Sequence, residues 1–145
     1  MKNLKLEAET IQISIYCEII LRILSNHKHL SVNKMLVFAY LIKKDRFIPR
    51  KIYNGNNTQD IIYKCISMLS GDYREYCNNI EFILKAIHLL NKNKLVLIEN
   101  NILQSCTESI IDLPIYEESM FLEKAIKASQ KMTEKQFMKE VTHIV

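Results

Sequence analysis

Hydrophobic and polar positions repeat with the period of an α-helix over most of the chain. Between residues 9 and 26 this period predicts a helix, carried by apolar side chains at Ile11, Ile15, Ile19, Ile20, Ile23 and Leu24. The next apolar run, from Lys34 to Lys44, is hydrophobic on almost every side, and Ser31 stands where a helix N-cap belongs. A helix of this kind has to be buried, so we expect it at the centre of the core, covered on more than one face.

Four further helices are predicted downstream. The run QDIIYKCISMLS after Thr58 predicts a third helix, and Gly71 is placed to end it in a left-handed conformation. A fourth helix is predicted from about residue 73 to residue 90, and two more over 117–131 and 133–143. Thr133 and Gln136 fit a capping box at the start of the last one. Pro49 and the run NGNNT predict a loop of about a dozen residues before the third helix.

The pattern changes from helix to strand and turn after residue 93. Two short apolar runs, 94–98 and 102–105, flank Asn100 and Asn101, and Asn tolerates the positive φ that a two-residue hairpin turn requires. Such a turn fixes the register, with Ile98 opposite Leu103 and Leu97 opposite Gln104. The first run is then apolar on both faces of its strand.

A helix followed directly by a hairpin is the way a winged helix ends. We therefore predict a mainly α protein, with a winged-helix-like domain and a short β-hairpin wing over residues 1–112. Residues 113–145 are predicted to form a C-terminal helical extension. Its apolar side chains either close the core or offer amphipathic helices to a partner groove, and the sequence leaves both alternatives open.

Composition describes a soluble globular chain. Apolar residues make up 48% and charged residues 25%, and the longest apolar run, 35–42, is far shorter than the ~20 residues that cross a bilayer. The start of the chain lacks the organisation of a signal peptide, so we expect no membrane association and a cytoplasmic location. The cysteines lie far apart without a C-x-x-C pair, which predicts reduced thiols: Cys17, Cys65, Cys77 and Cys106.

Groups for catalysis or metal binding are scarce. The chain has only two glycines, neither in a phosphate-binding pattern. His27 and His29 are spaced closely enough to suggest a metal pair, but they lie in a polar connector with no further ligands around them. Glu117 and Glu118 open a predicted helix, where its dipole stabilises them. We predict no catalytic residue, no metal and no cofactor, and hence no enzyme.

Charge is distributed unevenly. Segment 43–51 holds one acidic residue, Asp45, among its basic ones: Lys43, Lys44, Arg46, Arg50 and Lys51. Between Lys94 and Lys124 there is no basic residue, and the acidic ones are Glu99, Glu108, Asp112, Glu117, Glu118 and Glu123. This predicts one basic and one acidic region. The basic segment is a candidate for non-specific DNA contact, although a solvated charge run or a dock for an acidic protein surface is commoner.

The helix before the hairpin favours a protein partner over a DNA groove. It is apolar on two faces, with Glu81, Lys85 and His88 as a narrow polar stripe, whereas a DNA-reading helix offers Arg, Lys, Asn or Gln. The hairpin tip contains an acid and no base, which disfavours phosphate contact. The predicted partner-binding residues are Phe82, Lys85, Leu89, Val96, Leu97, Ile98, Phe121 and Leu122.

The order of these elements resembles a known family over roughly residues 9–110. The stretches LSVNKMLVFAYLIKK and LLNKNKLVLIENNILQS, with the helices around them, are similar to the small winged-helix subunit of three-component ABC-ATPase systems, the Lamassu-type anti-phage defence complexes of bacteria. The resemblance implies a non-catalytic adaptor that joins an SMC-like ATPase to an effector subunit. The alternative expectation is a winged-helix transcriptional regulator that binds DNA through the basic segment.

Overall fold

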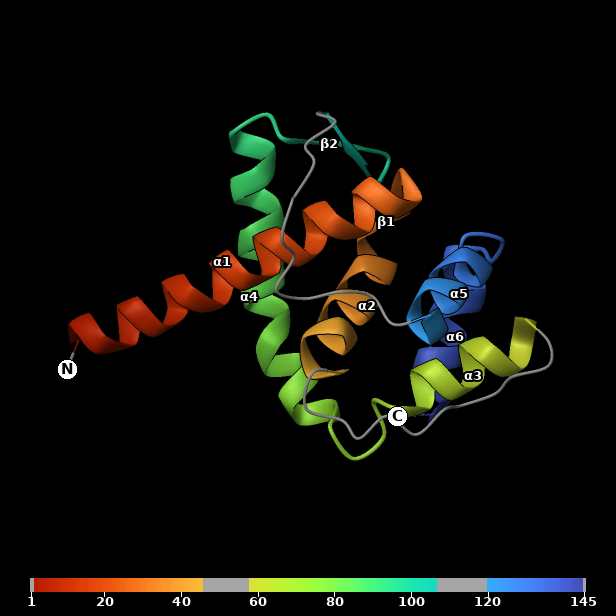
Figure 1. Ribbon diagram of the computed structural model, residues 1–145. Helices are drawn as coiled ribbons and strands as arrows, with labels where there is room; N and C mark the ends of the chain where they lie inside the picture. Colours follow the sequence, from red (N-terminus) through yellow and green to blue (C-terminus); the bar gives the residue numbers. More distant parts are fainter. Residues whose placement is uncertain (1, 46–57, 107–119, 145) are drawn as a thin grey trace.

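The computed structural model describes residues 2–45, 58–106 and 120–144. Over these residues the protein is mainly helical, with 76% helix and a small three-stranded antiparallel sheet (Figure 1). None of the helices in these segments combines the length and the apolar character that crossing a membrane requires. In chain order the elements are α1 Lys2–His27, β1 His29–Ser31, α2 Val32–Asp45, α3 Thr58–Ser67, α4 Tyr73–Lys92, β2 Val96–Glu99, β3 Ile102–Ser105, α5 Met120–Ser129 and α6 Glu134–Ile144.

Helix α2 is the centre of the core. Figure 1 shows it between α1 and α4 on one side and α5 and α6 on the other, and its side chains from Val37 to Ile42 are at most 3% exposed. The predicted central position, with cover on more than one face, is confirmed. The Ser31 hydroxyl accepts a hydrogen bond from the backbone N–H of Lys34 at 3.3 Å, so the predicted N-cap is present as well.

The hairpin has the predicted register. Ile98 lies opposite Leu103 and Leu97 opposite Gln104, and Asn100 and Asn101 have φ values of 53° and 62°. A turn with positive φ at both central residues matches the twist of the strands that it joins. The short side chain of Asn tolerates this conformation, which explains how a hairpin forms there without glycine.

The sheet has a third strand, which the sequence analysis did not predict. β1 pairs with β3 in the order β1–β3–β2, and it occupies the segment that was expected to be a polar connector around His29. Its Leu30 lies opposite Leu103, and both are at most 1% exposed. Three residues are too few to display the alternation of a strand in sequence, so only the pairing with β3 defines this element.

Helices α5 and α6 pack on the rest of the fold and are part of its core. The ring of Phe137 lies 5.7 Å from that of Phe38 on α2, and both side chains are fully buried. Of the two alternatives for the C-terminal helices, the described residues therefore show closure of the core. The predicted boundary between residues 112 and 113 falls outside the described segments.

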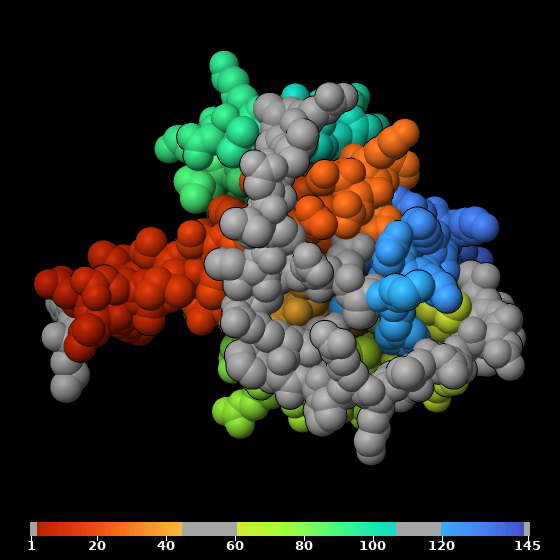
Figure 2. All heavy atoms as spheres, viewed as in Figure 1, coloured from red at the N-terminus to blue at the C-terminus, as the bar shows by residue number. Residues whose placement is uncertain are grey.

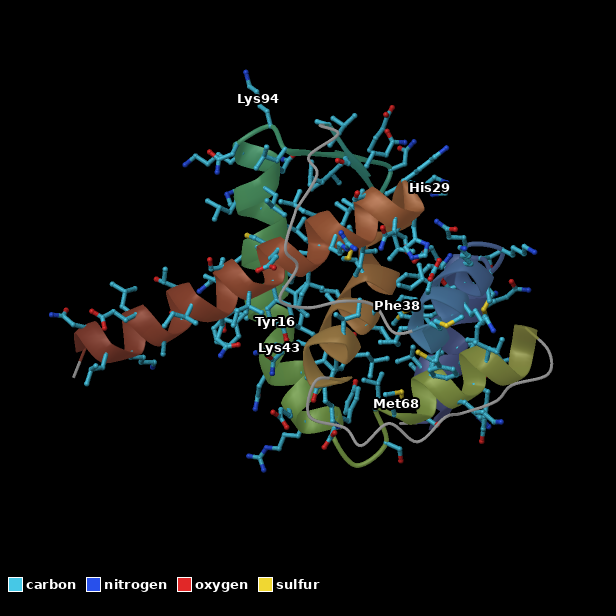
Figure 3. The ribbon with its side chains drawn as sticks, viewed as in Figure 1. Tyr16, His29, Phe38, Lys43, Met68 and Lys94 are labelled. Carbon is cyan, nitrogen blue, oxygen red and sulfur yellow. The ribbon has the colours of Figure 1, made fainter. Side chains whose placement is uncertain are left out.

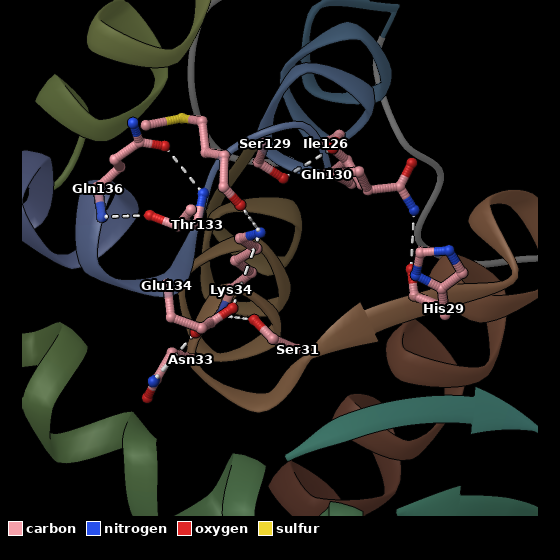
Figure 4. Close-up of polar contacts among 11 residues, drawn as sticks. His29, Ser31, Asn33, Lys34, Ile126, Ser129, Gln130, Thr133, Glu134 and Gln136 are labelled. Carbon is pink, nitrogen blue, oxygen red and sulfur yellow. Dashed lines mark hydrogen bonds and ion pairs between the residues drawn. The ribbon is translucent and has the colours of Figure 1, made fainter. Parts of the chain in front are cut away.

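Polar contacts tie the turn between α5 and α6 to the start of α2 (Figure 4). The buried ammonium of Lys34 donates to the carbonyl of Met132 at 2.7 Å and lies 3.7 Å from the Glu134 carboxylate. Burial lowers the pKa of Lys34, and Glu134 opposes that shift. The side-chain amide of Gln130 donates to the carbonyl of His29 at 2.8 Å, which caps the outer edge of β1.

The predicted helix boundaries hold in part. The capping box at α6 is confirmed, because Thr133 N–H donates to the side-chain oxygen of Gln136 at 3.0 Å and Gln136 N–H donates to the Thr133 hydroxyl at 3.1 Å. The first helix was expected to begin at residue 9 and begins at Lys2 instead. The predicted loop around Pro49 and residues 117–119 lie outside the described segments.

Two lysines occupy a backbone conformation that favours glycine. Lys28 ends α1 with φ 70° and Lys94 ends α4 with φ 61°. At Lys94 the bonds from Leu95 N–H to the Leu90 carbonyl and from Lys94 N–H to the Asn91 carbonyl form a Schellman motif. Its left-handed position usually holds glycine, as Gly71 does after α3 with φ 85°.

We therefore predict that Lys94→Gly and Lys28→Gly each raise the free energy of unfolding, by about 0.5–1 kcal/mol, because glycine relieves the left-handed strain. Gly71→Ala should lower the free energy of unfolding by about 1 kcal/mol, because alanine is strained in the left-handed conformation. The backbone alone causes this loss, since an added Cβ at this position meets no other atom within 4 Å. Urea unfolding measures all three. Equal stability of the lysine and glycine forms would mean that the left-handed backbone carries no cost.

Candidate protein-binding surface

The predicted partner-binding residues differ in how deeply the structure buries them. Val96 and Leu122 are at most 1% exposed and belong to the core, so they offer no surface to a partner in this conformation. Phe82 and Phe121 are half-buried and pack against the core. The remaining residues of the predicted set are exposed: Lys85, Leu89, Leu97 and Ile98.

We call the hairpin of β2 and β3 the wing, and it exposes apolar side chains on both faces of the sheet. Leu97 is 47% exposed and Ile102 39% exposed, and the register places them on the same outer face. Ile98 lies on the inner face opposite the buried Leu103 and is 37% exposed. A protein partner that contacted the wing would therefore meet these three apolar side chains beside the exposed polar ones of Glu99 and Gln104.

On α4, apolar side chains flank the predicted polar stripe. Leu84 and Leu89 are each 44% exposed, and the helical period places them on opposite sides of Lys85. Lys85 itself contacts the carboxylates of Glu9 on α1 and of Glu81, the latter at 3.0 Å. These contacts raise the pKa of Lys85, the hydrogen bond with Glu9 most of all. Lys85 therefore fastens α1 against α4.

A further exposed apolar surface lies on α1, outside the predicted partner-binding set. The N-terminal half of α1 projects from the body of the molecule (Figures 1 and 2), and we call its residues 3–12 the arm. Leu4 is 70% exposed, Leu6 63% and Ile11 58%. Leu4 and Ile11 share one side of the helix and Leu6 lies on another. Ile11 belongs to the predicted helix, whereas Leu4 and Leu6 lie before residue 9, where that helix was expected to begin.

The basic segment is partly engaged in internal contacts. The Lys43 ammonium lies 5.0 Å from the Tyr16 ring centroid and donates to the side-chain oxygen of Gln12. Burial lowers the pKa of Lys43. Lys44 forms an ion pair with Asp72. Arg46, Arg50 and Lys51 lie outside the described residues.

Candidate chemistry is sparse in the described segments. They contain no cluster of three or more His, Cys, Asp or Glu side chains that could hold a metal ion. None of the four cysteines, all of which lie in the described segments, forms a disulfide bond. Cys17 is half-buried and its sulfur lies 3.8 Å from the carbonyl oxygen of Ala86, and burial raises its pKa, which disfavours the reactive thiolate.

Comparisons of this chain with protein-family models, with curated proteins and with solved structures gave no significant match.

The difference in burial predicts effects on stability of very different size within the expected partner-binding set. Leu122→Ala should lower the free energy of unfolding by about 2–5 kcal/mol, because it leaves a cavity in the core. Leu97→Gln should change it by less than about 0.5 kcal/mol, since the side chain is exposed. Urea unfolding of the isolated protein tests both. A large loss with Leu97→Gln would mean that the wing surface serves the fold rather than a partner.

Proposed function

We propose that this protein is a non-catalytic adaptor with a winged-helix-like domain, which binds protein partners through its arm and its wing. The winged-helix reading is supported by the chain order α1, β1, α2, α4, β2, β3 together with the sheet order β1–β3–β2. In this arrangement the hairpin of β2 and β3 follows α4, and its strand β3 pairs with β1, the short strand that follows α1. Helix α3 would then be an insertion, and α5 and α6 an addition that completes the core.

The observation that carries the proposal is the exposed hydrocarbon of the arm. Leu4, Leu6 and Ile11 are each more than half exposed. Burying a leucine or isoleucine side chain contributes about 1.5–3 kcal/mol, so a partner groove that covered the arm would gain substantially. Helix-in-groove recognition uses apolar anchors of this kind. Apolar side chains on more than one side of the arm favour a groove that encloses it.

Three contacts favour a protein partner over DNA. In a DNA-reading winged helix the helix before the hairpin enters the major groove, which admits one helix. Here Glu9 on α1 contacts Lys85 on α4, so α1 lies against that helix and brings a carboxylate with it. Lys43 and Lys44, predicted as phosphate contacts, are engaged with Gln12 and Asp72. A transcriptional regulator remains the alternative that the experiment has to exclude.

The partner class follows from the sequence resemblance. We propose that the arm and the wing contact an SMC-like ABC ATPase and an effector subunit, and that the complex acts in bacterial anti-phage defence in the cytoplasm. The adaptor itself would need no metal and no cofactor. Its task would be to hold two larger proteins in a fixed relation.

The test is a tagged pull-down from the native host, with and without nuclease, followed by mass spectrometry. The arm variant carries Leu4→Gln, Leu6→Gln and Ile11→Gln, because glutamine removes the apolar surface and keeps a good helix propensity. A matched control carries Lys5→Gln, Glu7→Gln and Thr10→Gln, three exposed polar positions of the same arm.

We expect the wild type and the control to recover a large ATPase that survives nuclease treatment. The arm variant should recover at least about tenfold less, the effect of losing 1.4 kcal/mol of binding. Leu97→Gln tests the wing in the same way. Recovery of DNA and DNA-dependent proteins alone, or equal recovery of the ATPase by every variant, would contradict the adaptor proposal.

A further inference from the structure

The two halves of α1 are attached to the body by different kinds of contact. In the C-terminal half, Ile19, Ile20, Ile23 and Leu24 are at most 1% exposed, so apolar packing holds this part. In the N-terminal half, the residues that reach the body include Glu9 and Gln12, which do so through polar groups. The apolar side chains of the arm at Leu4, Leu6 and Ile11 face solvent instead.

We call the group of contacts that fastens the arm the polar latch. Lys85 on α4 contacts the Glu9 carboxylate, and Lys43 on α2 donates to the side-chain oxygen of Gln12. Figure 3 shows Lys43 beside Tyr16. The Tyr16 hydroxyl donates to the side-chain oxygen of Asn79 at 2.7 Å, and Lys43 lies 3.5 Å from the same oxygen. The latch therefore joins α1 to α4 at Lys85, and α1 to α2 and α4 at Lys43.

The arm has little else to keep it helical. A short helix is marginal in water, and most helical stability in proteins comes from packing an apolar face. Here the arm packs almost no apolar surface before the half-buried Ile13. The remaining stabilisation comes from continuity with the buried half of α1 and from the two lysine contacts of the latch.

We propose that the arm is an order–disorder element controlled by the polar latch. While Lys43 and Lys85 hold Gln12 and Glu9, residues 3–12 are helical and project from the body. When these contacts are lost, the arm unfolds and the half of α1 that follows Tyr16 stays folded. Such local opening is the ordinary behaviour of elements with few buried contacts, and it concerns the arm alone, whatever partner the arm binds.

The two lysines should respond differently to salt. The Lys85–Glu9 pair is open to solvent, with side chains 45% and 26% exposed, so added salt screens it. Lys43 is half-buried, and the side chains that it contacts, Gln12 and Asn79, are uncharged. Glu75, which also attracts Lys43, lies on α4 and not on the arm, so salt changes the contact of Lys43 with the arm little. Added salt should therefore destabilise the arm only by weakening the Lys85–Glu9 pair.

Amide hydrogen exchange tests this proposal, with the full chain as the sample. The variants are Lys85→Gln, Lys43→Met and both together. Methionine keeps the apolar stem of Lys43 beside Tyr16 and removes the ammonium. The matched controls are Lys127→Gln, which breaks an ion pair with Glu123 on α5, and Lys44→Met, which breaks the pair with Asp72. Neither control residue contacts α1 in these pairs.

We expect the amides of residues 6–12 to exchange about three- to tenfold faster in each latch variant, the factor for losing one contact of ordinary strength. The double variant should exceed both single variants. Amides of residues 17–27 should change by less than about twofold, and the controls should match the wild type. Raising salt from about 0.05 to 0.5 M should speed exchange in the wild-type arm and have no further effect in Lys85→Gln.

Two results would overturn the proposal. Unchanged exchange of residues 6–12 in the double variant would mean that the latch does not control the arm. Equal acceleration in residues 6–12 and 17–27 would mean that α1 opens as one unit. Neither result bears on partner capture by the apolar residues of the arm, so failure here and failure of the proposed function are distinguishable.

Discussion

The rest of this fold depends on the requirement to cover α2 on every side. Side chains from Val37 to Ile42 are all buried, and a helix that is apolar all round cannot remain at a surface. Helices α1 and α4 cover one side of α2, and α5 and α6 cover another (Figure 1). The contacts of Phe38 with Phe137 and of Lys34 with Met132 show that the C-terminal helices take part in this cover.

The need to cover α2 also decides which surfaces are left for function. Because α5 and α6 close the core, Leu122 and its buried neighbours could contact a partner only if the core were opened. Among the described residues, most exposed large apolar side chains lie on the arm, on α4 and on the wing: Leu4, Leu6, Ile11, Leu84, Leu89, Leu97, Ile98 and Ile102. Three others are exposed singly: Tyr63, Tyr73 and Met120. Such surface on an otherwise well-packed molecule is the reason to propose an adaptor.

The elements that the sequence predicted correctly are those with local causes. The Ser31 cap, the Thr133 capping box and the Asn100–Asn101 turn each depend on residues a few positions apart. The features that were missed depend on tertiary contacts. β1 exists through its pairing with β3, and the arm extends from a helix whose other half is buried. Likewise, the apolar residues Leu97 and Leu122 look equally hydrophobic in sequence, and only the fold separates the exposed one from the buried one.

Binding of a protein by the exposed apolar surface of the arm can be tested by site-specific photo-crosslinking in the native host. The crosslinking residue is placed at Leu6 and, as a control, at Tyr63 on α3, which is 52% exposed. We expect a nuclease-resistant crosslink from Leu6 to a large ATPase and none from Tyr63. Crosslinks from Leu6 to DNA alone, or the same products from both positions, would contradict this expectation.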